Sequence, residues 1–428
     1  MPHRTSRRLI TTFAFALIGA ASATSDAAES ASQAGLRLAW STTVPMRFTS
    51  EIHGWHLVDD NIYAMGSDGL IRVVRAATGE LAWMRKFNTD FVKLPGPRPF
   101  RKGATRGVVF TNIANLVFLN PATGEELPGY ERIHLRHPAT GSAATSGDQI
   151  FVAEPGERVR AYDMKTMLDD WVVRTNAILR ISPVFLPRSE QVLVAADGGI
   201  VASLDSLSGS QRFGTKVEGS PIGSMAVDEE EVYVSTDQAR LYGLSLTTGE
   251  RLLEYRLPDR PRGGPVVTAT SVYQSLEPAG MQRVGIKPGW PNWFAPDATM
   301  FLAEWAERVA YLNKGGELII ARVQTGEPVS TVSIESAQGG IANPHNHAIF
   351  VTNMRGEIRC YQPVDLPRLT SEDFVPAPII RENTPMGDEE GDVDAQPEDE
   401  SAPLNLDDQD EKAAPKAEIN DPLRSNRQ

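Results

Sequence analysis

Four histidines lie in two close pairs near opposite ends of the chain. His53 and His56 are three positions apart, and His345 and His347 are two positions apart. Imidazole nitrogens are common ligands of zinc and copper. Side chains alternate between the two faces of a strand, so His345 and His347 would share a face, whereas His53 and His56 would not. Because no paired carboxylates lie beside either pair at a recognisable spacing, we predict no metal site.

The sequence offers little for nucleophilic, redox or phosphate chemistry. It contains one cysteine, Cys360, so it cannot form an intramolecular disulfide, and it has no C-x-x-C-H haem motif. No glycine-rich phosphate loop opens a helix, and no G-x-S-x-G nucleophile motif occurs. We therefore predict no catalytic residue, and we interpret Cys360 as a small buried side chain in a strand.

An aromatic segment is the strongest candidate for binding. Residues 276–297 are rich in proline and glycine and contain Trp290, Trp293 and Phe294. Insertions into a repeat scaffold usually map to loops on one face, which is often the binding face. We predict that these three residues contact a partner protein. The alternatives are stacking on a polysaccharide, or rings that fold back into a small core of their own.

The elements that carry these residues repeat about every forty positions. Each repeat has an apolar run, a polar turn and an apolar residue at which the next run begins; these residues are Leu70, Leu116, Val159, Ile200, Leu241, Leu318 and Ile358. Their spacings are 46, 43, 41, 41, 77 and 40 residues, so one degenerate repeat lies in the long interval, around residues 272–274 and Met281. Eight such units predict an all-β, eight-bladed β-propeller, with seven blades as the alternative.

A second turn recurs within the repeats and is often followed by a bulky apolar side chain. Its central glycines are Gly79, Gly124, Gly209, Gly249 and Gly326. Trp83 and Phe213 stand four positions after their glycines, and we expect such rings to pack between neighbouring blades. Over residues 35–365, the pattern D/A-x-x-T-G-x-x-x-W resembles the blade motif of the PQQ-like quinoprotein propeller family. It resembles in particular the non-enzymatic branch, which includes the outer-membrane assembly lipoprotein of the BAM complex.

This resemblance implies two different kinds of function. The enzymes of the family hold PQQ over a calcium ion and carry a vicinal disulfide, which one cysteine cannot form, and no calcium-ligand set can be carried over to this sequence. We therefore predict a non-catalytic scaffold, without a cofactor, that binds a protein partner in the cell envelope or the extracellular space. The alternatives are a PQQ- and calcium-dependent oxidoreductase and a carbohydrate-binding module.

The N-terminal region predicts export. Residues 1–28 combine arginines with the apolar run Leu9–Ala20 and then small residues, an order typical of a secretory signal peptide and too short for a membrane span. We therefore predict a secreted or periplasmic protein. Residues 29–35 are interpreted as a linker, and Leu36–Trp40 as the strand that completes the last blade of a propeller spanning residues 36–365.

The C-terminal region carries most of the net charge. Of the 55 acidic residues, 17 follow residue 370, together with 5 of the 42 basic residues. Residues 366–428 are therefore predicted to be a disordered acidic tail, because such a composition cannot bury enough apolar surface to offset its ordering entropy. The propeller itself is close to neutral, which argues against nucleic acid as a partner.

Overall fold

The computed structural model describes residues 30–375, apart from residues 88–93, 113, 131, 167, 279 and 287–288. The chain divides into two units, Met1–Asn383 and Thr384–Gln428, and only the first contains described residues. The predicted signal peptide and most of the predicted acidic tail therefore lie outside the described residues. Within the described part, no helix has both the length and the apolar character needed to cross a membrane.

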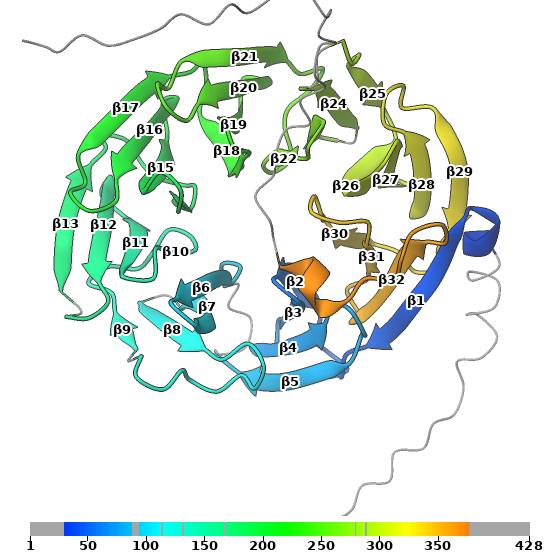
Figure 1. Ribbon diagram of the computed structural model, residues 1–428, viewed down its shortest axis with the longest axis horizontal. Coiled ribbons are helices and arrows are strands. Elements are labelled where there is room, and N and C mark those ends of the chain that lie inside the picture. The colour runs from blue at the N-terminus through cyan, green and yellow to red at the C-terminus, as the bar shows by residue number, and fades with distance from the viewer. Residues whose placement is uncertain are drawn as a thin grey trace, which may run out of the picture. The chain divides into compact units, whose positions relative to one another are not determined.

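The described residues form eight four-stranded antiparallel sheets, arranged as blades around a central axis (Figure 1). Blades one to four contain β2 (Ile52–Val58), β3 (Asn61–Gly66), β4 (Leu70–Arg75), β5 (Leu81–Lys86), β6 (Arg98–Lys102), β7 (Thr105–Asn112), β8 (Asn115–Leu119), β9 (Ile133–His134), β10 (Ala144–Thr145), β11 (Gln149–Glu154), β12 (Arg158–Asp163), β13 (Asp169–Arg174), β14 (Val184–Leu186), β15 (Gln191–Ala196), β16 (Ile200–Asp205) and β17 (Gln211–Lys216). Blades five to eight contain β18 (Pro221–Val227), β19 (Glu231–Thr236), β20 (Arg240–Ser245), β21 (Arg251–Arg256), β22 (Val266–Val267), β23 (Ser271–Ser275), β24 (Met281–Gly285), β25 (Trp293–Ala295), β26 (Ala298–Trp305), β27 (Arg308–Asn313), β28 (Glu317–Arg322), β29 (Pro328–Ser333), β30 (Gly339–Ile341), β31 (Ile349–Thr352), β32 (Glu357–Pro363) and β1 (Leu36–Thr43).

The predicted eight-bladed propeller is thus confirmed. Each residue that marked the repeat, from Leu70 to Ile358, lies at or next to the start of the third strand of its blade, and Met281 begins β24 of the degenerate blade six. The middle two strands of a blade are buried on both faces because a neighbouring sheet covers each side. The core therefore consists of apolar layers between adjacent blades, such as Tyr63, Val73, Val108 and Phe110 between blades one and two.

The N-terminal strand closes the ring, as the sequence predicted. β1 pairs antiparallel with β32, from Leu36 opposite Pro363 to Thr43 opposite Glu357, and so becomes the outermost strand of blade eight. In Figure 1 this strand lies beside β32 although the two are separated by almost the whole propeller in sequence. Pairing between the two ends hides edges that would otherwise be open to other chains.

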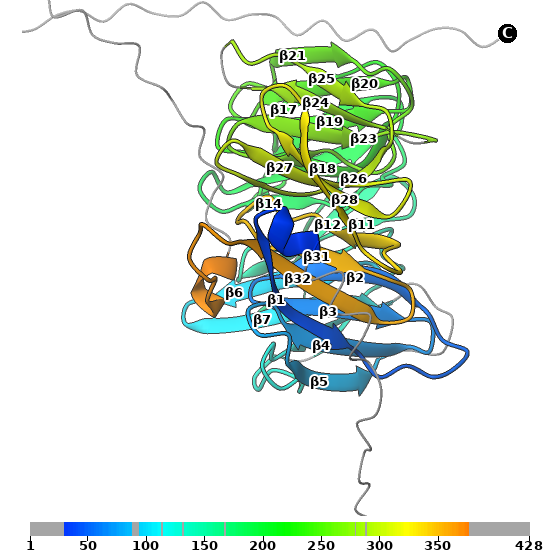
Figure 2. The same ribbon diagram turned by 90° about the vertical axis from the view of Figure 1, so that its right-hand side faces the viewer.

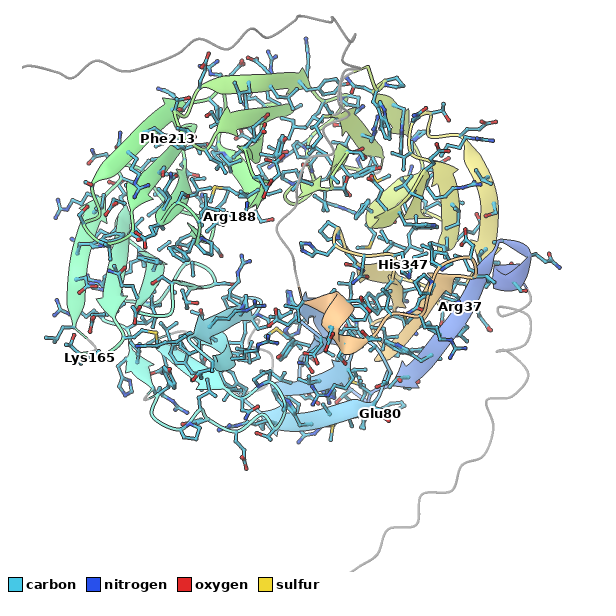
Figure 3. The ribbon with its side chains drawn as sticks, viewed as in Figure 1. Arg37, Glu80, Lys165, Arg188, Phe213 and His347 are labelled. Carbon is cyan, nitrogen blue, oxygen red and sulfur yellow. The ribbon has the colours of Figure 1, made fainter. Side chains whose placement is uncertain are left out.

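Aromatic side chains on the outer strands dock on the glycine turn of the following blade. The indole nitrogens of three tryptophans donate hydrogen bonds of 2.8–3.0 Å to backbone oxygens of that turn: Trp40 to Ala76, Trp83 to Pro121 and Trp171 to Ser206. Gly124 shows why the turn needs glycine, because its φ is +73° and an added Cβ would lie 2.5 Å from the Trp83 ring. Phe213, which Figure 3 labels on the outer strand of blade four, packs in the same way, since a Cβ on Gly249 would lie 2.4 Å from its ring. The predicted packing of these rings between blades is confirmed.

The propeller unit continues ten residues beyond the predicted boundary at residue 365. Residues 366–375 are described and contain the short 3-10 helix η1 (Ser371–Phe374), which lies at one face of the ring in side view (Figure 2). Phe374 is 2% exposed, and its ring centroid lies 6.1 Å from that of Phe350. Leu369 packs against the same apolar cluster, so two apolar side chains hold the start of the acidic segment against blade eight.

Cys360 is completely buried in β32, as expected for a small apolar side chain. Burial raises the pKa of its thiol, because the low-dielectric interior disfavours the thiolate. The thiol is therefore not poised for nucleophilic or redox chemistry.

Candidate functional site

A cavity of about 740 Å³ lies where the innermost strands approach the axis. It is lined by the first strands of blades one, two, five, six, seven and eight and by Ser142 of blade three; Figure 1 shows these strands facing the centre of the ring. Small residues such as Ser224 and Gly340 keep the axis open, because they bring little side chain into the space where eight blades converge. A concave space of this size is a candidate binding site.

Arg98 gives the axial cavity an unpaired positive charge. It begins β6, and within the described residues its side chain has no hydrogen bond and no ion pair. Burial lowers the pKa of its guanidinium, because a desolvated cation loses hydration energy. Asp59 is the one carboxylate among the described lining residues, and Arg101 already pairs with it at 2.7 Å. The cavity is therefore suited to an anion that can approach Arg98.

The two histidine pairs contribute one side chain each to this cavity. His56 of β2 and His345 of the loop after β30 both line it, because closure of the ring makes blades one and eight neighbours. His53 and His347 do not line it, and the His347 ring nitrogen instead lies 3.2 Å from the backbone oxygen of Pro367 (Figure 3). Residues 345–347 form a bend rather than a strand, so the alternation assumed from sequence does not apply there.

Metal ligation has no support in this arrangement. Within the described residues there is no group of three or more histidine, cysteine, aspartate or glutamate side chains that could hold a metal ion. Burial lowers the pKa of His345, so this imidazole is neutral at pH 7. His345 therefore provides a polar edge in the cavity rather than a charge.

The three aromatic residues of the blade six segment differ in their surroundings: Trp293 docks on the next blade, whereas Phe294 is exposed. Trp293 begins β25, and its indole nitrogen donates a 2.6 Å hydrogen bond to the backbone oxygen of Val323, so it docks on the Gly326 turn as Trp83 does on Gly124. Trp290 packs over the Arg283 guanidinium at 5.1 Å. Phe294 is 43% exposed and is the member of the trio that is most open to solvent. The sequence spacing could have predicted the docking of Trp293, because every docking ring precedes its glycine by 33 to 41 residues.

A buried carboxylate joins blade seven to blade six. Glu304 of β26 accepts hydrogen bonds from the hydroxyls of Tyr273 at 2.6 Å, Thr270 at 2.7 Å and Thr268 at 3.0 Å. Burial raises the pKa of Glu304, although these hydroxyls and the charge of Arg283 act in the opposite direction. Desolvation outweighs three hydrogen bonds here, because both oxygens lie between packed sheets. The network fixes the two blades together but leaves no free oxygen for a ligand.

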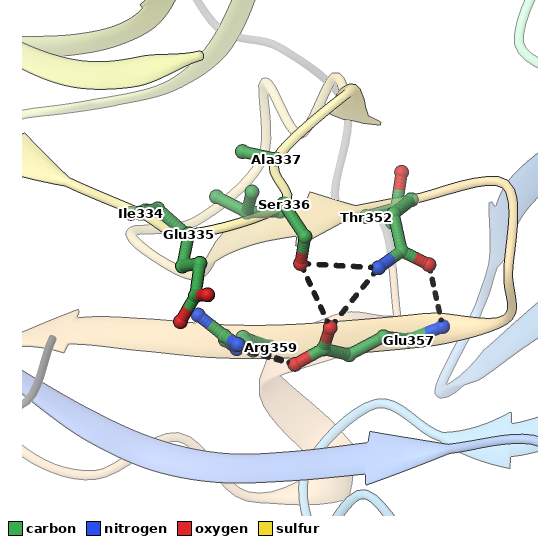
Figure 4. A pocket seen from close by; sticks show the side chains of 9 residues that line it. Ile334, Glu335, Ser336, Ala337, Thr352, Glu357 and Arg359 are labelled. Atoms are coloured by element: carbon green, nitrogen blue, oxygen red, sulfur yellow. Dashed lines mark hydrogen bonds and ion pairs between the residues drawn. The ribbon is translucent and has the colours of Figure 1, made fainter. Parts of the chain in front are cut away.

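Other buried charges also serve the fold. Arginines at the third position of three inner strands pair with carboxylates of their own blades: Arg72 with Asp68, Arg160 with Glu154, and Arg359 with Glu357. Figure 4 shows the small pocket beside the last pair, where Asn353 and Ser336 hydrogen-bond to Glu357 at 3.0 and 3.1 Å. Its volume of about 10 Å³ is about that of one water molecule, so it cannot hold an organic ligand.

Comparison with known proteins identifies one matching family and several similar structures. The family model described as "Outer membrane protein assembly factor BamB" matches residues 67–293 and 213–346, which together are more than half of the chain. The crystal structure of BamB from Moraxella catarrhalis is similar, with a TM-score of 0.60 and 16% identity, covering 78% of this chain and 99% of that one. The computationally designed Ika8 protein is also similar, with a TM-score of 0.56 and 14% identity, covering 75% and 98%. No curated protein sequence matches.

Proposed function

Because the chain belongs to the family of the outer membrane protein assembly factor BamB, we propose that it is a non-catalytic scaffold that binds a protein partner in the cell envelope. The family match over residues 67–346 is the observation that carries this proposal. The export signal predicted in residues 1–28 would deliver the chain to the periplasm or the exterior. Assembly of outer-membrane proteins, which the family model names, is the process in which we expect the scaffold to act.

The donor set of the axial cavity does not fit a PQQ–calcium centre. Calcium takes six to eight oxygen ligands, usually including several carboxylates. The described lining residues supply one carboxylate, Asp59, and Arg101 holds it. We therefore propose that the scaffold acts without a cofactor. The carbohydrate alternative also lacks support, since Trp293 is engaged between blades and cannot offer its ring to a sugar.

Two side chains are suited to a partner. Arg98 has no ion-pair partner among the residues that the structure describes, and this cation in the axial cavity favours a partner segment carrying a carboxylate. Phe294 presents an apolar ring at the rim of blade six, and aromatic side chains are frequent anchors of protein interfaces.

The proposal is tested in the organism that encodes the protein. Deleting the gene should reduce the amount of folded β-barrel protein in the outer membrane, measured by heat-modifiable migration, and the wild-type gene should restore it. Arg98→Glu should restore it poorly, because the variant repels an acidic partner segment. Arg106→Glu is the matched control, since Arg106 is exposed on the next strand of the same blade and does not line the cavity. Unchanged barrel assembly in the deletion strain would reject the proposed function.

A further inference from the structure

A second cavity lies at the seam where the ring closes. It has a volume of about 400 Å³ and shares no lining residue with the axial cavity. Its walls come from the end of β26 and the start of β27 and β29 in blade seven, and from the two ends of the propeller, residues 34–36 and 363–365. Figure 1 shows β29 and β1 meeting at this seam. The cavity therefore exists only because the N-terminal strand closes the ring against blade seven.

Two polar side chains in this cavity lack partners. Arg308 is half-buried at the start of β27, and within the described residues its guanidinium makes no hydrogen bond or ion pair; its Nη1 is buried. The Ser330 hydroxyl on β29 is likewise buried without a partner. By contrast, Arg72, Arg160 and Arg359 each hold a carboxylate. A buried donor without an acceptor is costly, so an acceptor that enters the cavity gains more than it would at the surface.

The rest of the lining is mainly apolar. The Trp305 ring and the side chains of Leu36, Ile320 and Val329 face this space. A guanidinium recognises the paired oxygens of a carboxylate, and the apolar wall suits a hydrocarbon or aromatic group attached to it. Asp365, exposed at the rim, disfavours a ligand with a second negative charge. This charge pattern favours a monoanionic carboxylate over a phosphate dianion.

We propose that the seam pocket binds a carboxylate carried on an apolar group, such as the C-terminal residue of a peptide. Arg308 holds the carboxylate, the Ser330 hydroxyl donates a hydrogen bond to it, and Trp305 covers the apolar side chain. The pocket volume lies within the range of small-ligand sites, which is about 300–1,000 Å³. This inference does not depend on the proposed assembly function, because it names a different cavity and a different ligand.

Isothermal titration calorimetry on the full chain tests the proposal. The probe is the peptide acetyl-Ala-Ala-Phe with a free C-terminus, and its C-terminal amide is the matched ligand without the charge. The free acid should bind and the amide should bind at least tenfold more weakly. Arg308→Gln should weaken the acid at least tenfold. Arg322→Gln is the matched variant, because Arg322 lies opposite Arg308 in the sheet but is exposed, pairs with Glu327 and does not line the pocket.

The remaining results of the titration either narrow the ligand class or overturn the proposal. If 3-phenylpropionate binds as tightly as the peptide, the site recognises free organic acids, whereas tighter peptide binding identifies a chain terminus. Equal binding of acid and amide, no binding at millimolar peptide, or full binding by Arg308→Gln would overturn the proposal. If Arg308→Gln does not fold, Arg308→Lys and Ser330→Ala replace it: both should fold and weaken the acid but not the amide, and unchanged acid binding in both would equally reject the site.

Discussion

The indole nitrogen of Trp40 donates a hydrogen bond to the backbone oxygen of Ala76 at 3.0 Å. Trp40 lies on the closing strand of blade eight, whereas Ala76 lies in the glycine turn of blade one. The N-terminal strand is therefore fixed on two sides, by pairing with β32 and by docking on the next blade. Both attachments join the N-terminal strand to segments that are far from each other in sequence, so they contribute to closure of the ring.

Trp40→Ala should destabilise the whole ring rather than one loop. The indole is 9% exposed, and replacing a buried tryptophan by alanine typically costs about 3–5 kcal/mol. Phe48→Ala is the control, because Phe48 is fully exposed in the loop that follows β1. Urea unfolding followed by circular dichroism measures both variants. Equal stability of the two would show that the docking contact does not support closure.

Gly124→Ala should be more destabilising than Gly156→Ala. Both glycines have positive φ, +73° and +83°, so both substitutions bring similar backbone strain. The added Cβ meets the Trp83 ring at 2.5 Å only at Gly124, whereas nothing lies within 4 Å at Gly156. The difference between the two melting temperatures therefore isolates the steric role of the docking turn, and identical melting temperatures would contradict that role.

Truncation should separate the two parts of the C-terminal region. A chain that ends at residue 375 keeps Phe374 in its site and should unfold within about 0.5 kcal/mol of the full chain. A chain that ends at residue 370 loses this buried ring and should be destabilised by about 3 kcal/mol. Differential scanning calorimetry of the three chains distinguishes these cases. A large loss of stability on ending at residue 375 would mean that the acidic segment itself contributes to the fold.

Stability should depend on pH through Glu304. Burial raises its pKa in the folded protein above the ordinary value of 4.5, so the native state binds more protons than the unfolded state in that window. The protonated Glu304 carboxyl adds to the free energy of unfolding. This stabilisation is complete below pH 4.5 and is lost as the pH rises through the raised folded pKa. Glu304→Gln does not titrate, so its stability relative to wild type should increase over this window, by at most about 1.4 kcal/mol per pH unit.

Urea unfolding at one-unit steps from pH 4 to pH 8 measures this dependence. Glu307→Gln is the control, because Glu307 is exposed in the adjacent turn and should leave the pH profile unchanged. A difference between Glu304→Gln and wild type that stays constant with pH would show that the carboxyl of Glu304 titrates normally.

The sequence by itself determined the blade architecture and its closure. Strand alternation, turn glycines such as Gly249 and the forty-residue spacing are local patterns, because backbone preference depends mainly on a residue and its near neighbours. The missing strand of the last blade pointed to Leu36–Trp40 for the same reason: a strand left without a partner must find one. The last strand, β32, ends at Pro363, two residues before the predicted end of the propeller, whereas the docking of Leu369 and Phe374 beyond it leaves no periodic signal in the sequence.

Only the tertiary structure decided which side chains meet in cavities. Arg98, His56 and His345 line one cavity although the two histidines are 289 positions apart in the sequence. Arg308 lines the seam pocket together with residues 34–36. The spacing of Trp293 and Gly326 matches the other docking pairs, but only the structure shows the indole nitrogen of Trp293 bonded to the backbone oxygen of Val323 in blade seven. Which side chains line the same cavity depends on ring closure and on side-chain direction, and local sequence patterns encode neither.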